Sequence, residues 1–239
     1  MYDKSKNKYF VSFNPMLGDI YLIASLTGES NERLSSIFIS HSENEKILLE
    51  RSRAAYGTAT SQLVNYHQCC KAFWFRDYTT VMKCCETYDN IHQTSRKRLI
   101  RITDICNSFY GGLAMFILSR KFKEQKLIAD GETHLLAMKI WETTCKWNFE
   151  NKSMLLEAEC HYAKGDNANA MVAYAKSIAS ARDHNFIHEE ALAEELFGIF
   201  YIENGEVRKG SELIKHARDL YIQWGAHKKA SLLYYPSSI

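Results

Sequence analysis

Two stretches near the end of the chain decide its fold: GDNANAMVAYAKSIASA at Gly165–Ala181 and GEVRKGSELIKHARDLY at Gly205–Tyr221. In each, a glycine is followed by a small residue five positions on and by a large apolar or aromatic residue four positions further. The matching pairs are Gly165 and Gly205, Ala170 and Gly210, and Tyr174 and Ile214. This order of residues is typical of the second helix of a tetratricopeptide (TPR) repeat.

The helix before each glycine fits the same pattern at an interval of 40 residues. Ala158 and Gly198 are the small residues expected on the first helix, where only a small side chain lets two helices approach closely. Tyr201 is the aromatic residue expected three positions later, whereas His161 stands at that position in the earlier repeat. Two further features depart from the TPR pattern. The interval is longer than a TPR repeat, which has about 34 residues, and neither repeat ends in proline.

The rest of the chain predicts helix after helix, because its two prolines, Pro15 and Pro236, leave everything between them free of proline. A short helix is expected before Gly28, and Asp77 and Ser95 are expected helix N-caps. Apolar spacing predicts helices over residues 62–75, 77–88, 95–117, 131–145, 151–164, 166–184, 188–204 and 206–221, followed by a short tail helix. We therefore expect an all-α, TPR-like right-handed superhelix of about five antiparallel helix pairs over residues 53–235, preceded by an irregular segment over residues 1–52.

Composition narrows the class of protein. A net charge of +2 over 239 residues is too small to indicate nucleic-acid binding. The longest apolar run is too short to span a membrane, and the polar start after Met1 predicts no signal peptide. Seven cysteines without disulfide-scaffold spacing indicate reduced thiols and hence a cytoplasmic location.

Several segments resemble a known family. They are Phe75–Tyr78, Tyr110–Ala114, Trp147–Phe149, Leu155–Glu159, Tyr174–Ile178, His188–Leu196 and Tyr221–Ala226. Together they are similar to the C-terminal TPR-like helical region of large multidomain signalling proteins. Those proteins join a serine/threonine-kinase-like domain and a STAND/AAA-type NTPase to this region, and often carry GAF and histidine-kinase domains. The resemblance covers roughly residues 53–235 and implies an interaction and coupling module, with no catalytic residue to carry over.

Three motifs that suggest chemistry are better explained by structure. Gly205–Ser211 resembles a P-loop but lacks its lysine and a preceding strand. His184 and His188 have metal-ligand spacing only if one helix carries both, and a turn is expected between them. The pairs Cys69-Cys70 and Cys84-Cys85 lack the C-x-x-C spacing of zinc sites and are interpreted as buried thiols. We predict no catalytic, cofactor-binding or metal-binding residue.

The partner-binding candidates lie on the first helices of the last two repeats, which line the concave face of a TPR superhelix. They are Lys152, Leu155, Glu159 and Tyr162 in one repeat and Leu192, Glu195, Ile199, Ile202 and Glu203 in the next. Packing in the core is the alternative role for the apolar members. A second candidate is the basic cluster Arg96, Lys97, Arg98 and Arg101, which opens a region, residues 96–126, with eight basic against two acidic residues and hence a net charge of +6. It fits an acidic partner segment, or else a solvated face.

Three functional hypotheses follow. The first is a non-catalytic protein-protein interaction or scaffold module that binds a protein or peptide, with no nucleic acid and no membrane involved. The second is a regulatory fragment of a larger kinase or NTPase signalling protein. The third is an enzyme with an unrecognised site. The repeat pattern favours the first.

Overall fold

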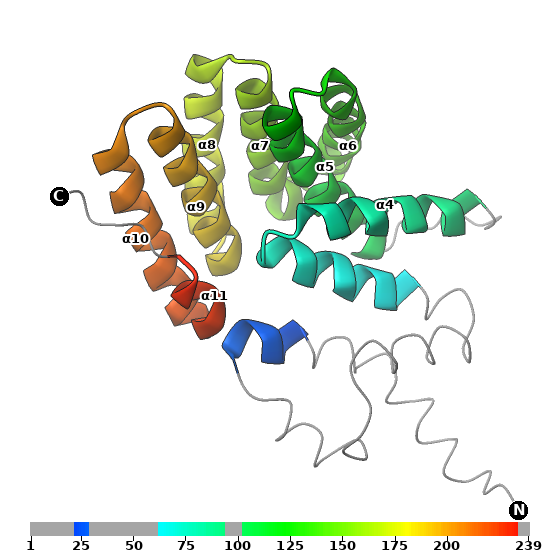
Figure 1. Cartoon of the computed structure of the whole chain (residues 1–239), viewed down its shortest axis with the longest axis horizontal. Coiled ribbons are helices and arrows are strands. Elements are labelled where there is room, and N and C mark those ends of the chain that lie inside the picture. The colour runs from blue at the N-terminus through cyan, green and yellow to red at the C-terminus, as the bar shows by residue number, and fades with distance from the viewer. Residues whose placement is uncertain (1–21, 29–61, 94–101, 234–239) are drawn as a thin grey trace, which may run out of the picture. The chain divides into compact units, whose positions relative to one another are not determined.

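The computed structural model describes residues 22–28, 62–93 and 102–233, and within them every regular element is a helix (Figure 1). The chain divides into two compact units, Met1–Asn107 and Ser108–Ile239. The predicted domain boundary at residue 52 and the predicted N-cap Ser95 lie outside the described residues. The all-α prediction is confirmed for the described ranges.

The first unit contains three described helices. The predicted short helix occupies residues 22–27 and ends at Gly28, whose φ of +84° suits glycine. A helix over residues 62–74 is followed by α4, Tyr78–Gln93. Asp77 caps α4 as predicted, since its carboxylate accepts the backbone N–H of Thr80 at 3.1 Å.

The second unit is a series of helices joined by short turns (Figure 1). They are α5 (Ile102–Phe122), which begins shortly before the boundary between the units, α6 (Gln125–Thr144), α7 (Lys146–Ala163), α8 (Asn167–Asp183), α9 (Ile187–Glu203), α10 (Val207–Trp224) and α11 (His227–Ser231). From α6 onward each helix packs against the next. We call α5, α7 and α9 the first helices of three pairs and α6, α8 and α10 the second helices, and α11 is the predicted tail helix.

Five of the six turns in this unit share one geometry, and the exception is the α6–α7 turn at Cys145, whose φ is −145°. A residue with positive φ is followed by a residue whose N–H donates to the carbonyl oxygen five positions back, at 2.8–3.1 Å, which is the Schellman motif. The positive-φ residues are Lys123, Gly165, Asn185, Gly205 and Gly225, with φ of +56° to +91°. From Gly165 onward they recur every 20 residues, so two helices and two turns make the 40-residue repeat that the sequence predicts.

The last pair crosses where two glycines meet. A Cβ on Gly210 would lie 2.5 Å from both the carbonyl oxygen of Gly198 and Cγ1 of Ile202, and a Cβ on Gly198 would lie 2.9 Å from the carbonyl oxygen of Gly210. No side chain fits between the two backbones. This contact is why the pattern requires small residues at both positions.

Two predicted helix starts are wrong. We expected a helix to open at Gly131, but α6 begins at Gln125 and holds Gly131 in its interior. The glycine marks the crossing with α5, since a Cβ there would lie 2.7 Å from the ring of Phe116. We also expected a helix from Asn151, but α7 begins at Lys146, and an ion pair of 3.0 Å between Lys146 and Glu150 spans its first turn.

Replacing Gly210 tests the crossing. Gly210→Ala should lower the free energy of unfolding by about 2 kcal/mol or more, because the added methyl group forces α9 and α10 apart. Ordinarily a glycine-to-alanine change inside a helix stabilises by about 1 kcal/mol. Denaturant unfolding measures the difference, with Ser211→Ala as the control one residue further along. A stabilised Gly210→Ala variant would contradict the crossing.

Candidate partner-binding site

Three ion pairs link the first helix of one pair to the next first helix, and the last of them reaches α11. They are Arg120 with Glu159 at 2.7 Å, Lys152 with Glu189 at 2.7 Å, and Glu195 with Lys229 at 2.8 Å. Every one of these six side chains is less than one fifth exposed. We call the three pairs the buried charge links. Each joins helices that are separated in sequence by a complete second helix.

The first link extends into an aromatic cluster. Glu159 also accepts a hydrogen bond from the hydroxyl of Tyr174 on α8. Burial, together with the nearby charge of Glu159, raises the pKa of Tyr174 well above its ordinary value. The guanidinium of Arg120 lies 4.1 Å from the ring centroid of Tyr162, whose hydroxyl donates to Glu203 on α9 at 2.5 Å. The ion pair joins the first two helix pairs, and Tyr162, which lies against its cation, extends the contact to the third.

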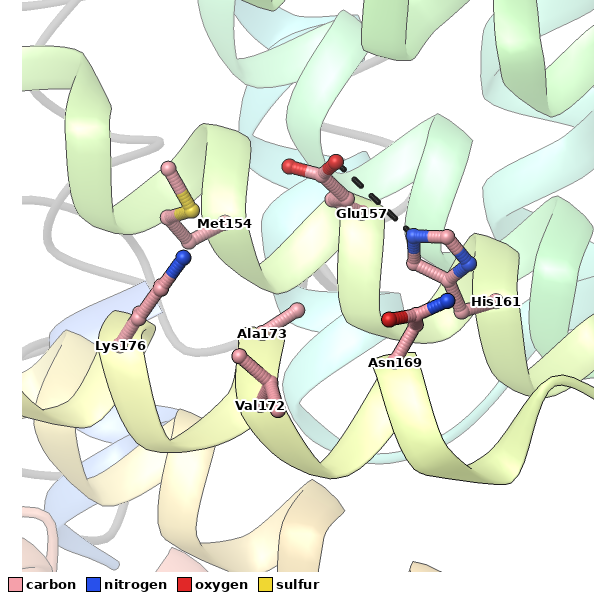
Figure 2. Close-up of a pocket in the computed structure, with 7 residues that line it drawn as sticks. All are labelled: Met154, Glu157, His161, Asn169, Val172, Ala173 and Lys176. Atoms are coloured by element: carbon pink, nitrogen blue, oxygen red, sulfur yellow. Dashed lines mark ion pairs between the residues drawn. The ribbon is translucent and has the colours of Figure 1, made fainter.

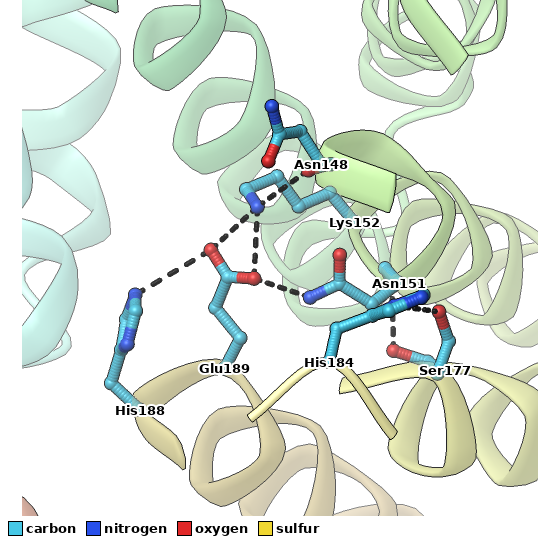
Figure 3. Close-up of polar contacts among 8 residues, drawn as sticks. Asn148, Asn151, Lys152, Ser177, His184, His188 and Glu189 are labelled. Atoms are coloured by element: carbon cyan, nitrogen blue, oxygen red, sulfur yellow. Dashed lines mark hydrogen bonds and ion pairs between the residues drawn. The ribbon is translucent and has the colours of Figure 1, made fainter. Parts of the chain in front are cut away.

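The second link is centred on Glu189, in the first turn of α9 (Figure 3). Lys152 lies 2.7 and 2.8 Å from its two carboxylate oxygens, the side-chain amide of Asn151 donates to it, and Nε2 of His188 lies 3.5 Å away. Ser177 on α8 donates to the carbonyl oxygen of Asn151 at 2.8 Å. Burial opposes ionisation, but the contacts with His188 and Lys152 prevail and lower the pKa of Glu189.

The third link is the most buried. The side chains of Glu195 and Lys229 are each 3% exposed, and the hydroxyl of Tyr221 on α10 donates to the same carboxylate at 2.7 Å. A buried carboxylate is tolerated only when its oxygens are satisfied, as they are here. The tail helix α11 is thus attached to α9 by charge as well as by its packing on α10.

Four of the predicted groove residues belong to the interior. Leu155, Glu159, Leu192 and Glu195 are each 2% exposed or less, so no partner reaches them in this structure. Their prediction as surface groove residues is corrected. For the two glutamates the physical reason is the stacking itself, because Arg120 of the preceding first helix engages Glu159 and Lys229 of α11 engages Glu195.

The other candidates divide by position. Lys152, Tyr162, Ile199 and Ile202 are half-buried, and Glu203 is exposed. Lys152, Tyr162 and Glu203 take part in contacts between α7 and α9. The basic residues Arg96, Lys97, Arg98 and Arg101 lie outside the described residues. A partner-binding role for these nine residues stays a prediction.

An open pocket of about 290 Å³ lies between α7 and α8 (Figure 2). Met154, Glu157 and His161 line it from α7, and Asn169, Val172, Ala173 and Lys176 line it from α8. Glu157 lies 3.9 Å from Nε2 of His161, whose Nδ1 lies 3.3 Å from Asp166. None of the lining residues was a candidate from the sequence, although the histidine in an aromatic position was the signal that marked the place.

Two exposed apolar side chains lie on α6, and Lys139 of the same helix forms an ion pair with Glu157 of the pocket lining. Lys139 of α6 reaches across to Glu157 at 3.1 Å, and Leu136 and Ile140 lie on the same face of α6 as that lysine. Leu136 is 62% exposed, Ile140 57% and Val172, in the pocket wall, 52%. We call Leu136, Ile140, Met154 and Val172, with the charged residues between them, the α6–α8 surface.

The motifs that suggested chemistry occupy structural positions. Gly205 is a turn residue and Gly210 is the helix crossing, so both glycines of the P-loop-like stretch are accounted for. His184 ends α8 and His188 lies in α9, with Asn185 in the left-handed turn between them. Among the described residues no group of three or more His, Cys, Asp and Glu side chains is arranged to hold a metal ion. None of the described helices is long and apolar enough to cross a membrane.

Comparison with known proteins adds no relative. No protein-family model matches the chain, and neither a curated protein nor a solved structure matches it.

The third charge link can be measured by a double-mutant cycle. Lys229→Met should lower the free energy of unfolding by about 3–5 kcal/mol, because it leaves the Glu195 carboxylate buried and unpaired. Glu195→Gln in the same chain should recover part of the loss, since the neutral amide still accepts from Tyr221. Denaturant unfolding of the two single variants and the double variant gives the coupling. Additive effects would show that the pair contributes nothing as a pair.

The lowered pKa of Glu189 predicts a dependence of stability on pH. Folding favours its carboxylate, so the stabilisation is present above the ordinary pKa of 4.5 and is lost as pH falls through the lower folded-state value. Unfolding free energy measured from neutral pH to about pH 3 should fall less steeply in Glu189→Gln than in the wild type. Parallel curves for the two proteins would count against the assigned contacts of Glu189.

Proposed function

We propose that this chain is a non-catalytic protein-protein interaction or scaffold module, built as a TPR-like right-handed superhelix. The 20-residue spacing of turns and the Gly198–Gly210 crossing support the repeat architecture. Such repeats stack into extended surfaces on which partners bind. The proposed role follows from that architecture together with one feature of the surface.

That feature is the apolar part of the α6–α8 surface, and it carries the proposal. Leu136, Ile140 and Val172 are each more than half exposed, although most apolar side chains of the same helices are buried or half-buried. Grouped apolar side chains on a folded surface, surrounded by polar residues, mark sites where another protein binds. The surrounding polar residues here are Lys139, Glu157 and Lys176.

The setting that we propose is signal transduction in the cytoplasm. It rests on the resemblance of the helices to the C-terminal region of multidomain signalling proteins and on the seven cysteines, which suit a reducing compartment. We propose a protein or peptide partner with acidic character. The exposed lysines of the α5–α6 turn, Lys121, Lys123 and Lys126, are consistent with such a partner.

Affinity capture from the native cell, with the full chain as bait, tests the proposal. Leu136→Glu with Ile140→Glu should reduce recovery of the specific partner about ten-fold or more, because two charges then replace the apolar contact. Ile222→Glu, an exposed apolar position on α10 at 41%, is the matched control and should retain the partner. Circular dichroism confirms that all variants fold. A bait that recovers no partner dependent on this surface would contradict the proposal.

A further inference from the structure

The pocket between α7 and α8 lies where two positions depart from the residues of the next pair. His161 stands where the next pair has Tyr201, 40 residues on, and Glu157 stands where that pair has Phe197. In the TPR pattern an aromatic residue fills the wedge beside the helix crossing. The two pairs therefore provide an internal comparison of one groove with and without aromatic filling.

In the last pair aromatic side chains occupy the corresponding positions. The rings of Phe197 and Tyr201 lie 4.6 Å apart, and the ammonium of Lys209 lies 5.7 Å from the Tyr201 ring. Glu194 contacts His216 of α10, and Arg182 of α8 also reaches it at 3.2 Å. Most of these residues stand 40 positions after a residue that lines the pocket. Their side chains contact one another, and the carboxylate of Glu194 is paired with His216 and Arg182.

In the α7–α8 pair the pocket is open, and among the described residues one charged side chain of its lining forms no ion pair. Glu157 is engaged by Lys139 at 3.1 Å, and Asp166 accepts the backbone N–H of Asn169 at 3.2 Å and lies beside His161. Lys176, by contrast, forms no ion pair with any residue in the part of the chain that the structure describes. Its side chain extends along the pocket toward Met154 (Figure 2).

The chemistry of the lining selects a ligand. Met154, Val172 and Ala173 provide an apolar wall, and the ammonium of Lys176 is the cation at one end of it. A volume of about 290 Å³ lies at the small end of ligand sites, which suits one or two side chains and is too small for most cofactors. An acidic side chain, with methylene groups for the apolar wall and a carboxylate for Lys176, matches both features.

We propose that this pocket binds an aspartate or glutamate side chain of an acidic peptide segment in the partner protein. The carboxylate pairs with Lys176, and the backbone of the segment lies across Leu136 and Ile140 on the α6–α8 surface. The inference rests on the proposed interaction function and names the chemistry of the partner. It also gives the departure at His161 a role, since an aromatic residue there would occupy the site.

Selection of short random-sequence peptides on the immobilised full chain tests the inference. We expect the selected peptides to be enriched in aspartate and glutamate. Their affinity should fall about ten-fold or more in Lys176→Glu, which reverses the charge, and in His161→Phe, which restores the aromatic filling. Lys215→Glu makes the same charge change on the exposed face of α10 and should leave affinity within about two-fold. Because Lys176 is exposed, its variant is expected to fold even if His161→Phe does not.

Two outcomes overturn the inference. One is a set of peptides without acidic enrichment, or whose affinity both pocket variants leave unchanged. The other is a selection that yields no peptide at all. A failure of the proposed interaction function is recognised by a different result: affinity capture then recovers no partner whose binding depends on Leu136 and Ile140. If a partner is captured and its binding tolerates Lys176→Glu, only the pocket inference is overturned.

Discussion

The stacking of the C-terminal unit depends on charges that are buried between its first helices. Arg120, Glu159, Lys152, Glu189, Glu195 and Lys229 lie where successive first helices, or α9 and α11, meet. A lone charge in such a place would cost several kcal/mol, and only a partner at hydrogen-bond distance offsets that cost. In the observed register of neighbouring helices, both oxygens of each carboxylate have donors. Apolar contacts alone would tolerate several registers.

The second helices complete these links. Tyr174, Ser177 and Tyr221 project from α8 and α10 and donate hydrogen bonds to the glutamates or to the backbone beside them. The first helices thus carry the charges and the second helices carry the neutral donors that satisfy them. This division explains why Glu159 and Glu195, which the TPR pattern predicts on the concave face, are interior: their carboxylates form contacts between helices of the repeat. The surface that we propose for partners lies where the repeat pattern is broken.

The sequence predicts the helices and turns well where the pattern is local. Gly165 and Gly205 adopt the positive φ of the turns that the pattern predicts, and the carboxylate of Asp77 caps α4 as expected. Gly131 was wrongly predicted to begin a helix, because the sequence alone does not distinguish a glycine inside a helix from a glycine at its end. In the structure Gly131 lies inside α6 and packs against the ring of Phe116. Lys123 and Asn185 adopt left-handed turns without glycine, so these two turns carry no glycine signal.

The site was less predictable for a different reason. Glu159 and Glu195 were predicted as residues of a partner-binding groove, whereas both are buried. Their partners Arg120 and Lys229 lie 39 and 34 residues away, and periodicity does not reveal such pairings. The pocket has the same origin, because it joins two helices and depends on what is missing at His161. Hydrogen exchange followed by mass spectrometry tests the central claim that the charge links unite the repeat. In Glu189→Ala, the account predicts that protection falls together in α7 and α9, whereas loss confined to the first turn of α9 would contradict it.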